Sequence, residues 1–168
     1  MLSKDDLDYL RGLSVFAGLS SEVVDSIGEH ARRVDVRARD VLLSEGEPAK
    51  EMLVVLQGKL QVVKRNADGR EAILATLGPG AVAGEMSLID IQPRSAEVRA
   101  VGPAAVVVLG HADIATIYRE DQKSYTLLVL NIAREISLRL RRLDALLANL
   151  VFEIGDVTSS DLGDSGPP

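Results

Sequence analysis

Apolar side chains near the start of the chain recur at steps of three and four residues. The positions are Leu7, Leu10, Leu13, Phe16, Leu19, Val23, Val24 and Ile27. This is the period of an amphipathic helix, so two or three short helices are predicted within residues 1–33. The second is predicted to begin at Ser20 or Ser21, because a serine oxygen can accept a hydrogen bond from an exposed helix-start amide.

After Val34 the pattern changes to short runs of β-branched and other apolar residues, separated by glycine, proline and an Asn-Ala-Asp-Gly segment. The runs are VDVRARDVLLSEG, EMLVVLQGKLQVVKR, EAILATL, AEVRAV and AAVVVLG. Short β-rich runs divided by turn residues indicate strands. Residues 34–112 are therefore predicted to form an antiparallel β sandwich or barrel.

The helical period returns over residues 113–153, with a stripe at an average step of about 3.5 residues, the coiled-coil repeat. The stripe is Val129, Ile132, Ile136, Leu140, Leu143, Leu147 and Leu150. We predict a homodimer that forms through residues 129–150; the alternative, equally favoured up to about Ile136, is a helix packed on its own β domain. Residues 154–168 are small, acidic and proline-capped, and they are predicted to be a disordered tail.

The composition limits the function. The hydrophobic share of 46% is enough for one globular domain with a tail, and the net charge of −6 argues against a main role in binding nucleic-acid backbones. The chain has no cysteine, which excludes thiol chemistry and fits a reducing, cytoplasmic setting. It has no apolar run long enough for a membrane span.

One acid and one base stand ten residues apart, in Gly84-Glu85 and Arg94-Ser95. A planar guanidinium can give a phosphate two parallel donors, a serine hydroxyl can add a third, and a carboxylate can accept from a ribose 2′-hydroxyl. Gly84 lets the backbone come close, and Glu85 is predicted to open a short helix. These groups suit a 3′,5′-cyclic nucleotide. The plainer reading is an internal ion pair that ties two loops.

Gly84-Glu85, Leu88, Pro93-Arg94-Ser95-Ala96 and the following Val-Arg-Ala resemble the phosphate-binding cassette of the cyclic-nucleotide-binding domain family. Segments 41–47, 54–58 and 77–80 resemble the same family, and the likeness covers residues 8–152, most closely in the catabolite-activator type of bacterial regulator. The resemblance implies a mainly β fold, an antiparallel β-roll (jelly-roll) with N-terminal helices and a long C-terminal helix. It places the cassette at 84–96, with ligand contacts from Gly84, Glu85, Met86, Ser87, Arg94, Ser95 and Ala96.

The resemblance also has departures. Regulators of this type continue into a DNA-binding helix-turn-helix domain, which this chain does not, so we expect no DNA binding by it. Where those relatives place a hydroxyl against the adenine, this chain has Leu143 and Asp144, the candidate purine lid. Relatives that prefer cGMP often carry threonine after the cassette arginine, so Ser95 favours cAMP.

The predicted function is a cAMP-binding, or less favourably cGMP-binding, regulatory protein that acts on an unknown protein partner through movement of its last helix. The alternative is a structural dimer of the same fold with a degenerate or differently occupied pocket. No enzyme activity, cofactor or metal is expected, because His30 and His111 lie far apart in the sequence without clustered acids.

Overall fold

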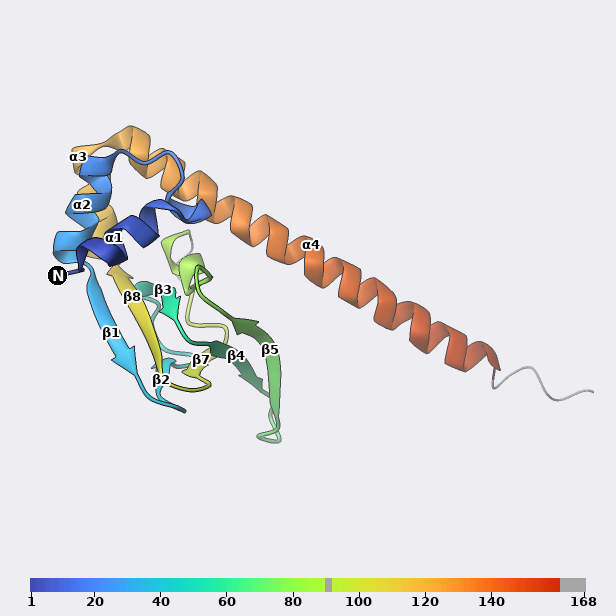
Figure 1. Ribbon diagram of the computed structural model, residues 1–168. Coiled ribbons are helices and arrows are strands. Elements are labelled where there is room, and N and C mark those ends of the chain that lie inside the picture. The colour runs from blue at the N-terminus through green and yellow to red at the C-terminus, as the bar shows by residue number, and fades with distance from the viewer. Residues whose placement is uncertain (90–91, 161–168) are drawn as a thin grey trace, which may run out of the picture. The chain divides into compact units, whose positions relative to one another are not determined.

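The structure is a computed structural model that describes residues 1–89 and 92–160. The chain divides into two compact units, Met1–Asn131 and Ile132–Pro168. Figure 1 labels the elements along the chain. The strands and the shorter helices belong to the first unit, and the long last helix begins there and continues into the second.

Three short helical elements open the first unit, as predicted. They are α1 (Lys4–Arg11), the 3-10 helix η1 (Ser14–Phe16) and α2 (Ser21–His30). The Ser20 side chain accepts a hydrogen bond from the Val23 amide and caps α2, which confirms the predicted start. Leu10 and Ile27 are among the fully buried side chains of these helices, so the apolar faces seen in the sequence are the packed ones.

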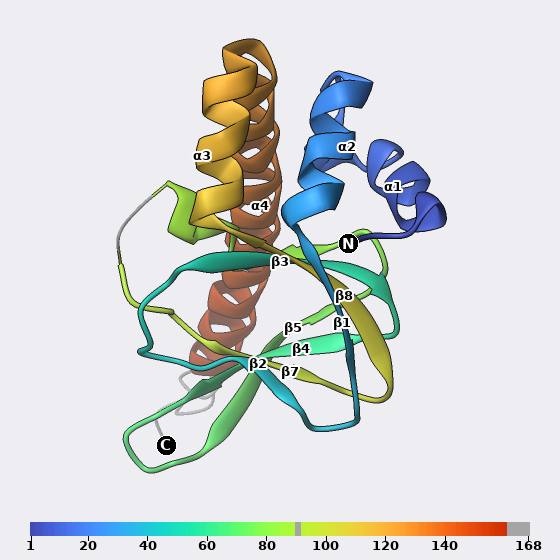
Figure 2. The ribbon, with the colours of Figure 1, turned by 90° about the vertical axis from the view of Figure 1, so that its left-hand side faces the viewer.

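The β region forms two four-stranded antiparallel sheets within the described residues, ordered β1-β8-β3-β6 and β2-β7-β4-β5. Figure 2 shows them as two layers. The strands are β1 (Arg32–Val36), β2 (Val41–Leu43), β3 (Glu51–Gln57), β4 (Leu60–Arg65), β5 (Glu71–Leu77), β6 (Val82–Ala83), β7 (Glu97–Ala100) and β8 (Ala104–Gly110). The predicted fold class, an antiparallel β-roll flanked by helices, is confirmed.

The core lies between the sheets. Leu53 of β3 and Val106 of β8 belong to the same buried cluster as Leu60 of β4 and Val98 of β7, because alternate side chains of each strand point to one face. The residues on the other face of β3 and β8 are buried as well. β3 and β8 are therefore covered on both sides, which explains why these two strands are nearly continuous apolar runs.

Two features of the β region were not predicted. The first apolar run is broken into β1 and β2 by a turn in which Arg39 has a φ of 72°. The two-residue strand β6 pairs with β3 immediately before the candidate cassette. The predicted β region, residues 34–112, is shifted by two residues towards the C-terminus, because β1 begins at Arg32 and β8 ends at Gly110.

Two helices follow the sheets, α3 (His111–Glu120) and α4 (Gln122–Ser160). Within the first unit α4 is packed: Leu128 is 1% exposed, and the Asn131 side chain donates to the backbone oxygens of Val15 and Ala17 at 3.2 and 2.9 Å. A buried amide that satisfies two loop carbonyls fixes the start of α4 against the N-terminal segment.

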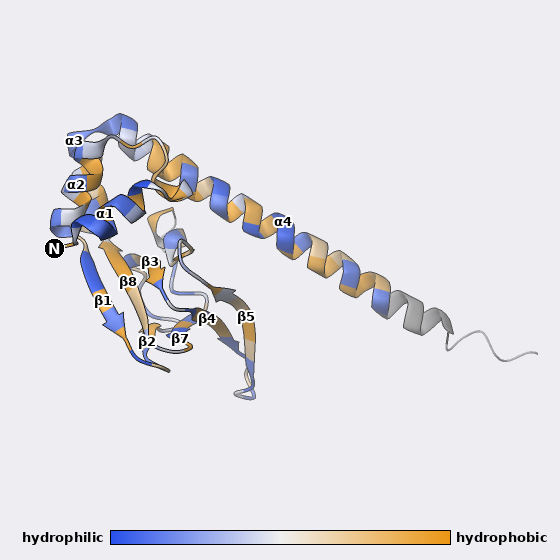
Figure 3. Cartoon of the chain, in the orientation of Figure 1, coloured by the Kyte–Doolittle hydropathy of each residue, from blue (hydrophilic) through white to orange (hydrophobic). Residues whose placement is uncertain are grey.

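Further along α4, every side chain from Leu140 to Glu153 is exposed in the single chain. Apolar and polar residues alternate along it (Figure 3). The helix runs to Ser160, so the disordered tail predicted from residue 154 is wrong for residues 154–160, and residues 161–168 lie outside the described part. Gly155 alone does not end the helix, since an isolated glycine costs only about 1 kcal/mol there.

Candidate functional site

The site begins at Gly84, which joins β6 to the 3-10 helix η2 (Glu85–Leu88) in a left-handed conformation with φ 75°. A Cβ atom at this position would lie 3.0 Å from the Glu51 carbonyl oxygen and 3.1 Å from Leu43 Cδ1, and it would overlap Nη1 of Arg94. Glycine is therefore required at position 84 for two reasons: the positive backbone angle and the close approach of the Arg94 guanidinium. The short helix predicted to start at Glu85 is present.

Arg94 lies across the turn from Gly84, although ten residues separate them in the chain. Its Nη1 donates to the Gly84 carbonyl oxygen at 3.4 Å, and its Nη2 donates to the Glu51 carbonyl oxygen at 2.5 Å. The Arg94 backbone is held too, because its amide donates to Glu47 O and its oxygen accepts from the Gly46 amide, both at 2.9 Å. The guanidinium is thus anchored by backbone groups of two other segments.

The electrostatic surroundings of Arg94 are mixed. Burial lowers the pKa of the half-buried guanidinium, while the carboxylates of Glu51, Glu47 and Glu85 act to raise it. An arginine stays protonated in proteins throughout the physiological range, so the site holds a permanent cation. The two carbonyl bonds use two of the five N–H donors of a guanidinium, and an anion can be bound by the others.

Glu85 and Arg94 are the charged pair that the sequence singles out, and the structure brings them into one site. Glu85 is 2% exposed, and its carboxylate is close enough to influence the pKa of Arg94. Burial of a carboxylate is costly unless polar or charged groups compensate it. The acid and the base of the cassette therefore share a site whose backbone is held by β3 and β6.

The other predicted contact residues vary in exposure. Met86 is 47% exposed and Ala96 is buried, while Ser95 is exposed and its backbone oxygen accepts from Lys64 Nζ at 2.7 Å. The Ser87 side chain lies outside the described part of the chain. The candidate purine lid, Leu143 and Asp144, belongs to the second unit, and its role stays a prediction.

Residues 44–51 also support Arg94, and the sequence did not predict this. A cavity of about 370 Å³ adjoins the guanidinium there. Its other lining residues are Leu42, Leu43, Glu47, Pro48, Lys50 and Glu51. The Ser-Glu-Gly-Glu pattern of residues 44–47 was recognised only as part of a fold pattern, whereas it supplies the backbone atoms that hold Arg94 in place.

Among the described residues, no cluster of three or more histidine, aspartate or glutamate side chains is arranged to hold a metal ion. In the same part of the chain, no helix combines the length and hydropathy needed to cross a membrane.

With this geometry established, comparison with known proteins decides the family. The sequence pattern of the Cyclic nucleotide-binding domain matches residues 33–121, more than half of the chain. The chain belongs to the cyclic nucleotide-binding domain family. The match contains both sheets except the first residue of β1, together with η2 and Arg94, so the cassette lies inside the cyclic nucleotide-binding domain.

Individual relatives agree with this assignment. The Cyclic AMP receptor protein of Thermus thermophilus is 32% identical over 86% of this chain, and a CRP-like cAMP-activated global transcriptional regulator of Mycobacterium tuberculosis is 26% identical over the same share. This chain spans only 65% and 63% of their lengths. A solved cyclic nucleotide-binding domain from Methylobacillus flagellatus superposes with a TM-score of 0.74 at 26% identity, covering 85% of this chain and 81% of that one.

Gly84→Ala tests the close approach at the cassette. The Cβ would displace Arg94, and we expect cAMP affinity to fall at least about tenfold, or about 1.4 kcal/mol, in isothermal titration. Gly69→Ala is the matched control, because Gly69 has a similar φ of 78° and nothing within 4 Å of its Cβ position. Equal affinities of the two variants would show that the approach at Gly84 does not matter for binding.

Proposed function

We propose that this domain binds a 3′,5′-cyclic nucleotide, with cAMP preferred over cGMP. The observation that carries the proposal is the Arg94 guanidinium, held by the carbonyl oxygens of Gly84 and Glu51 beside the buried Glu85. A monoanionic cyclic phosphate matches a partly buried cation with spare donors. The names of the relatives, a cAMP receptor and a cAMP-activated regulator, support the choice of ligand.

The proposed output is regulatory. Ligand binding would change how the C-terminal helix packs, and a homodimer formed through residues 129–150 would transmit that change to a protein partner in the cytoplasm. Support comes from α4, which is packed at Leu128 and Asn131 and carries exposed apolar side chains further on. A helix that is fixed at one end and apolar along its exposed part is suited to change partners.

Isothermal titration of the protein with cAMP, cGMP and 5′-AMP tests the ligand proposal. We expect saturable binding of cAMP, weaker binding of cGMP, and binding of 5′-AMP at least about tenfold weaker than that of cAMP, because its phosphate is not held in the ring. Absence of heat with both cyclic nucleotides, in protein whose folding is verified by circular dichroism, would favour the structural dimer with a degenerate pocket.

Glu85→Gln tests the ribose contact. The carboxylate is the better acceptor for a 2′-hydroxyl, so cAMP binding should weaken about tenfold, a typical loss for a hydrogen bond to a charged group. Binding of 2′-deoxy-cAMP should change little. Glu47→Gln is the control, since Glu47 also influences Arg94 electrostatically but has no proposed ribose contact. Equal losses for the two nucleotides would exclude this role for Glu85.

A further inference from the structure

A second cavity, of about 360 Å³, lies on the sheet β2-β7-β4-β5 and shares no lining residue with the cavity beside Arg94. We call it the arginine cavity. Its polar lining is Arg39, Gln61, Arg65, Glu97 and Arg99. Val98 points into the core, so its neighbours Glu97 and Arg99 lie on the opposite face of β7, where side chains alternate. The cavity is therefore on the outer face of the β-roll.

A buried carboxylate with unused bonding capacity lines this cavity. Glu97 is 7% exposed. Its Oε2 lies 3.2 Å from Arg65 Nη1, and its Oε1 lies 3.6 Å from Arg99 Nη1, which is too long for a hydrogen bond. Oε1 has no hydrogen-bond partner among the described residues. A buried acceptor without a donor carries a desolvation cost. Oε1 is closed to solvent, so a rotation of the Glu97 side chain that turns this oxygen towards a donor in the cavity would remove the cost.

The charges of the cluster leave an excess of positive charge. Glu71 bridges the guanidinium groups of Arg65 and Arg99 at 2.7 and 2.8 Å, and hydrogen bonds from Arg99 and Arg65 hold the pKa of Glu71 at about 2. Both glutamates therefore oppose only two of the three arginines. The Arg39 side chain forms no ion pair or hydrogen bond with any residue that the structure describes. Arg39, which is exposed, is therefore the arginine of the cluster without a carboxylate partner among the described residues.

Arg39 also has a strained backbone. Its φ of 72° lies in the left-handed region, which is unfavourable for a residue other than glycine. Its amide donates to the Ala100 oxygen at 2.9 Å, which fixes the turn at the end of β7. Arg39 therefore lines the same cavity as Glu97, whose Oε1 has no donor.

We propose that the arginine cavity is a second ligand site, for a small organic anion that carries one negative group and a hydroxyl. The anionic group binds the Arg39 guanidinium and neutralises the excess charge, and the hydroxyl donates to the Glu97 carboxylate. Val41 and Val101 supply apolar surface for the carbon frame. Hydroxycarboxylates and phosphate monoesters share this chemistry. The site is independent of the cassette and does not rest on cyclic-nucleotide binding.

NMR titration of the ¹⁵N-labelled protein with lactate, propionate and inorganic phosphate tests the site. We expect lactate to shift the amide resonances of residues 99–101 and to bind at least about tenfold more tightly than propionate, which lacks the hydroxyl. If phosphate binds as tightly as lactate or more tightly, the ligand class is the phosphate monoesters and not the hydroxycarboxylates. Equal binding of lactate and propionate, or shifts outside the cavity, would overturn the proposal.

Arg39→Gly provides the decisive variant, because glycine adopts the observed φ without strain and the fold is expected to survive. Lactate affinity should fall at least about tenfold, whereas Arg37→Ala, which removes an exposed arginine of the same turn, should leave it unchanged. Glu97→Gln should reduce the preference for lactate over propionate. Unchanged lactate binding in Arg39→Gly would mean that the cluster is only an ion-pair network of the sheet.

Discussion

Arg94→Ala is expected to weaken cAMP binding by about 2–5 kcal/mol, or roughly 30-fold to several thousandfold, as for the loss of one partner of a buried charge pair. The guanidinium is the cation that the structure places between the Gly84 and Glu51 carbonyl oxygens. Its removal would leave the nucleotide phosphate without its charged partner. Isothermal titration with cAMP measures the loss.

Two variants make the result specific. Arg94→Lys keeps the charge but loses the planar pair of donors, so its affinity should fall between those of the parent and the alanine variant. Arg37→Ala removes an exposed arginine outside the cassette and should bind as the parent does. Thermal melts should show that all three remain folded. If Arg94→Ala bound cAMP within a few-fold of the parent, the cassette assignment would be wrong.

The sequence predicted which residues share the site but not which groups support them. The proximity of Gly84 and Arg94 followed from the family resemblance, and their contact is present at 3.4 Å. The partner at Glu51, 43 residues earlier, was not predicted. Its contribution is a backbone oxygen, and every residue has one, so no residue type marks it. Such contacts follow from the strand pairing and not from composition.

The helices and strands also differ in how well the sequence predicts them. Long runs such as β3 and β8 were recognised because each contains at least five consecutive apolar residues. β6 has two residues, which is too short for a period of two to be visible. The end of α4 was placed too early because most of residues 155–160 are small or polar, although no proline occurs there to stop the helix. Periodicity identifies elements better than it identifies their ends.

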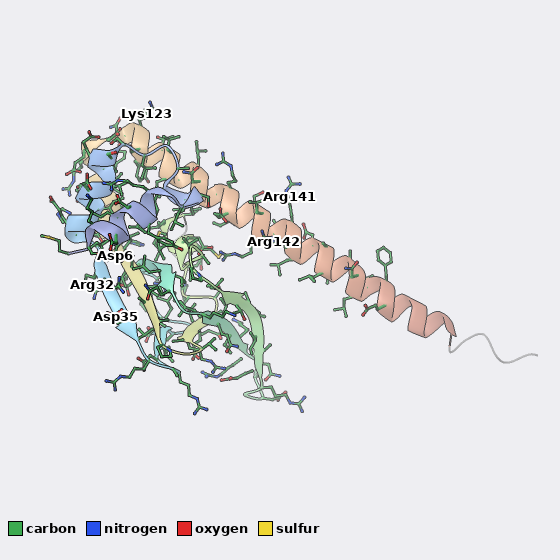
Figure 4. The ribbon with its side chains drawn as sticks, viewed as in Figure 1. Asp6, Arg32, Asp35, Lys123, Arg141 and Arg142 are labelled. Atoms are coloured by element: carbon green, nitrogen blue, oxygen red, sulfur yellow. The ribbon has the colours of Figure 1, made fainter. Side chains whose placement is uncertain are left out.

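The exposed part of α4 leads to the second large expected effect. Leu143 and Leu147 are 52% and 60% exposed in the single chain, and they belong to the stripe with an average spacing of about 3.5 residues that is typical of paired helices. Arg141 and Arg142, on the same segment, project from the helix as charged side chains (Figure 4). An apolar stripe of this length beside charged positions is expected to be covered by a second copy.

Replacing both Leu143 and Leu147 with glutamate should convert the dimer to monomers, because four carboxylates would be buried without partners at the centre of the seam. Ala145→Glu with Asn149→Glu is the matched control, since it adds the same charge at the same spacing about 200° around the helix and should leave the dimer intact. Analytical ultracentrifugation at concentrations on the order of tens of micromolar, where specific association is populated, measures the difference. A parent protein that sediments as a monomer would refute dimerisation through α4. If cAMP affinity falls in the leucine variant but not in the control, the stripe also contributes to the nucleotide site, as the predicted purine lid at Leu143 requires.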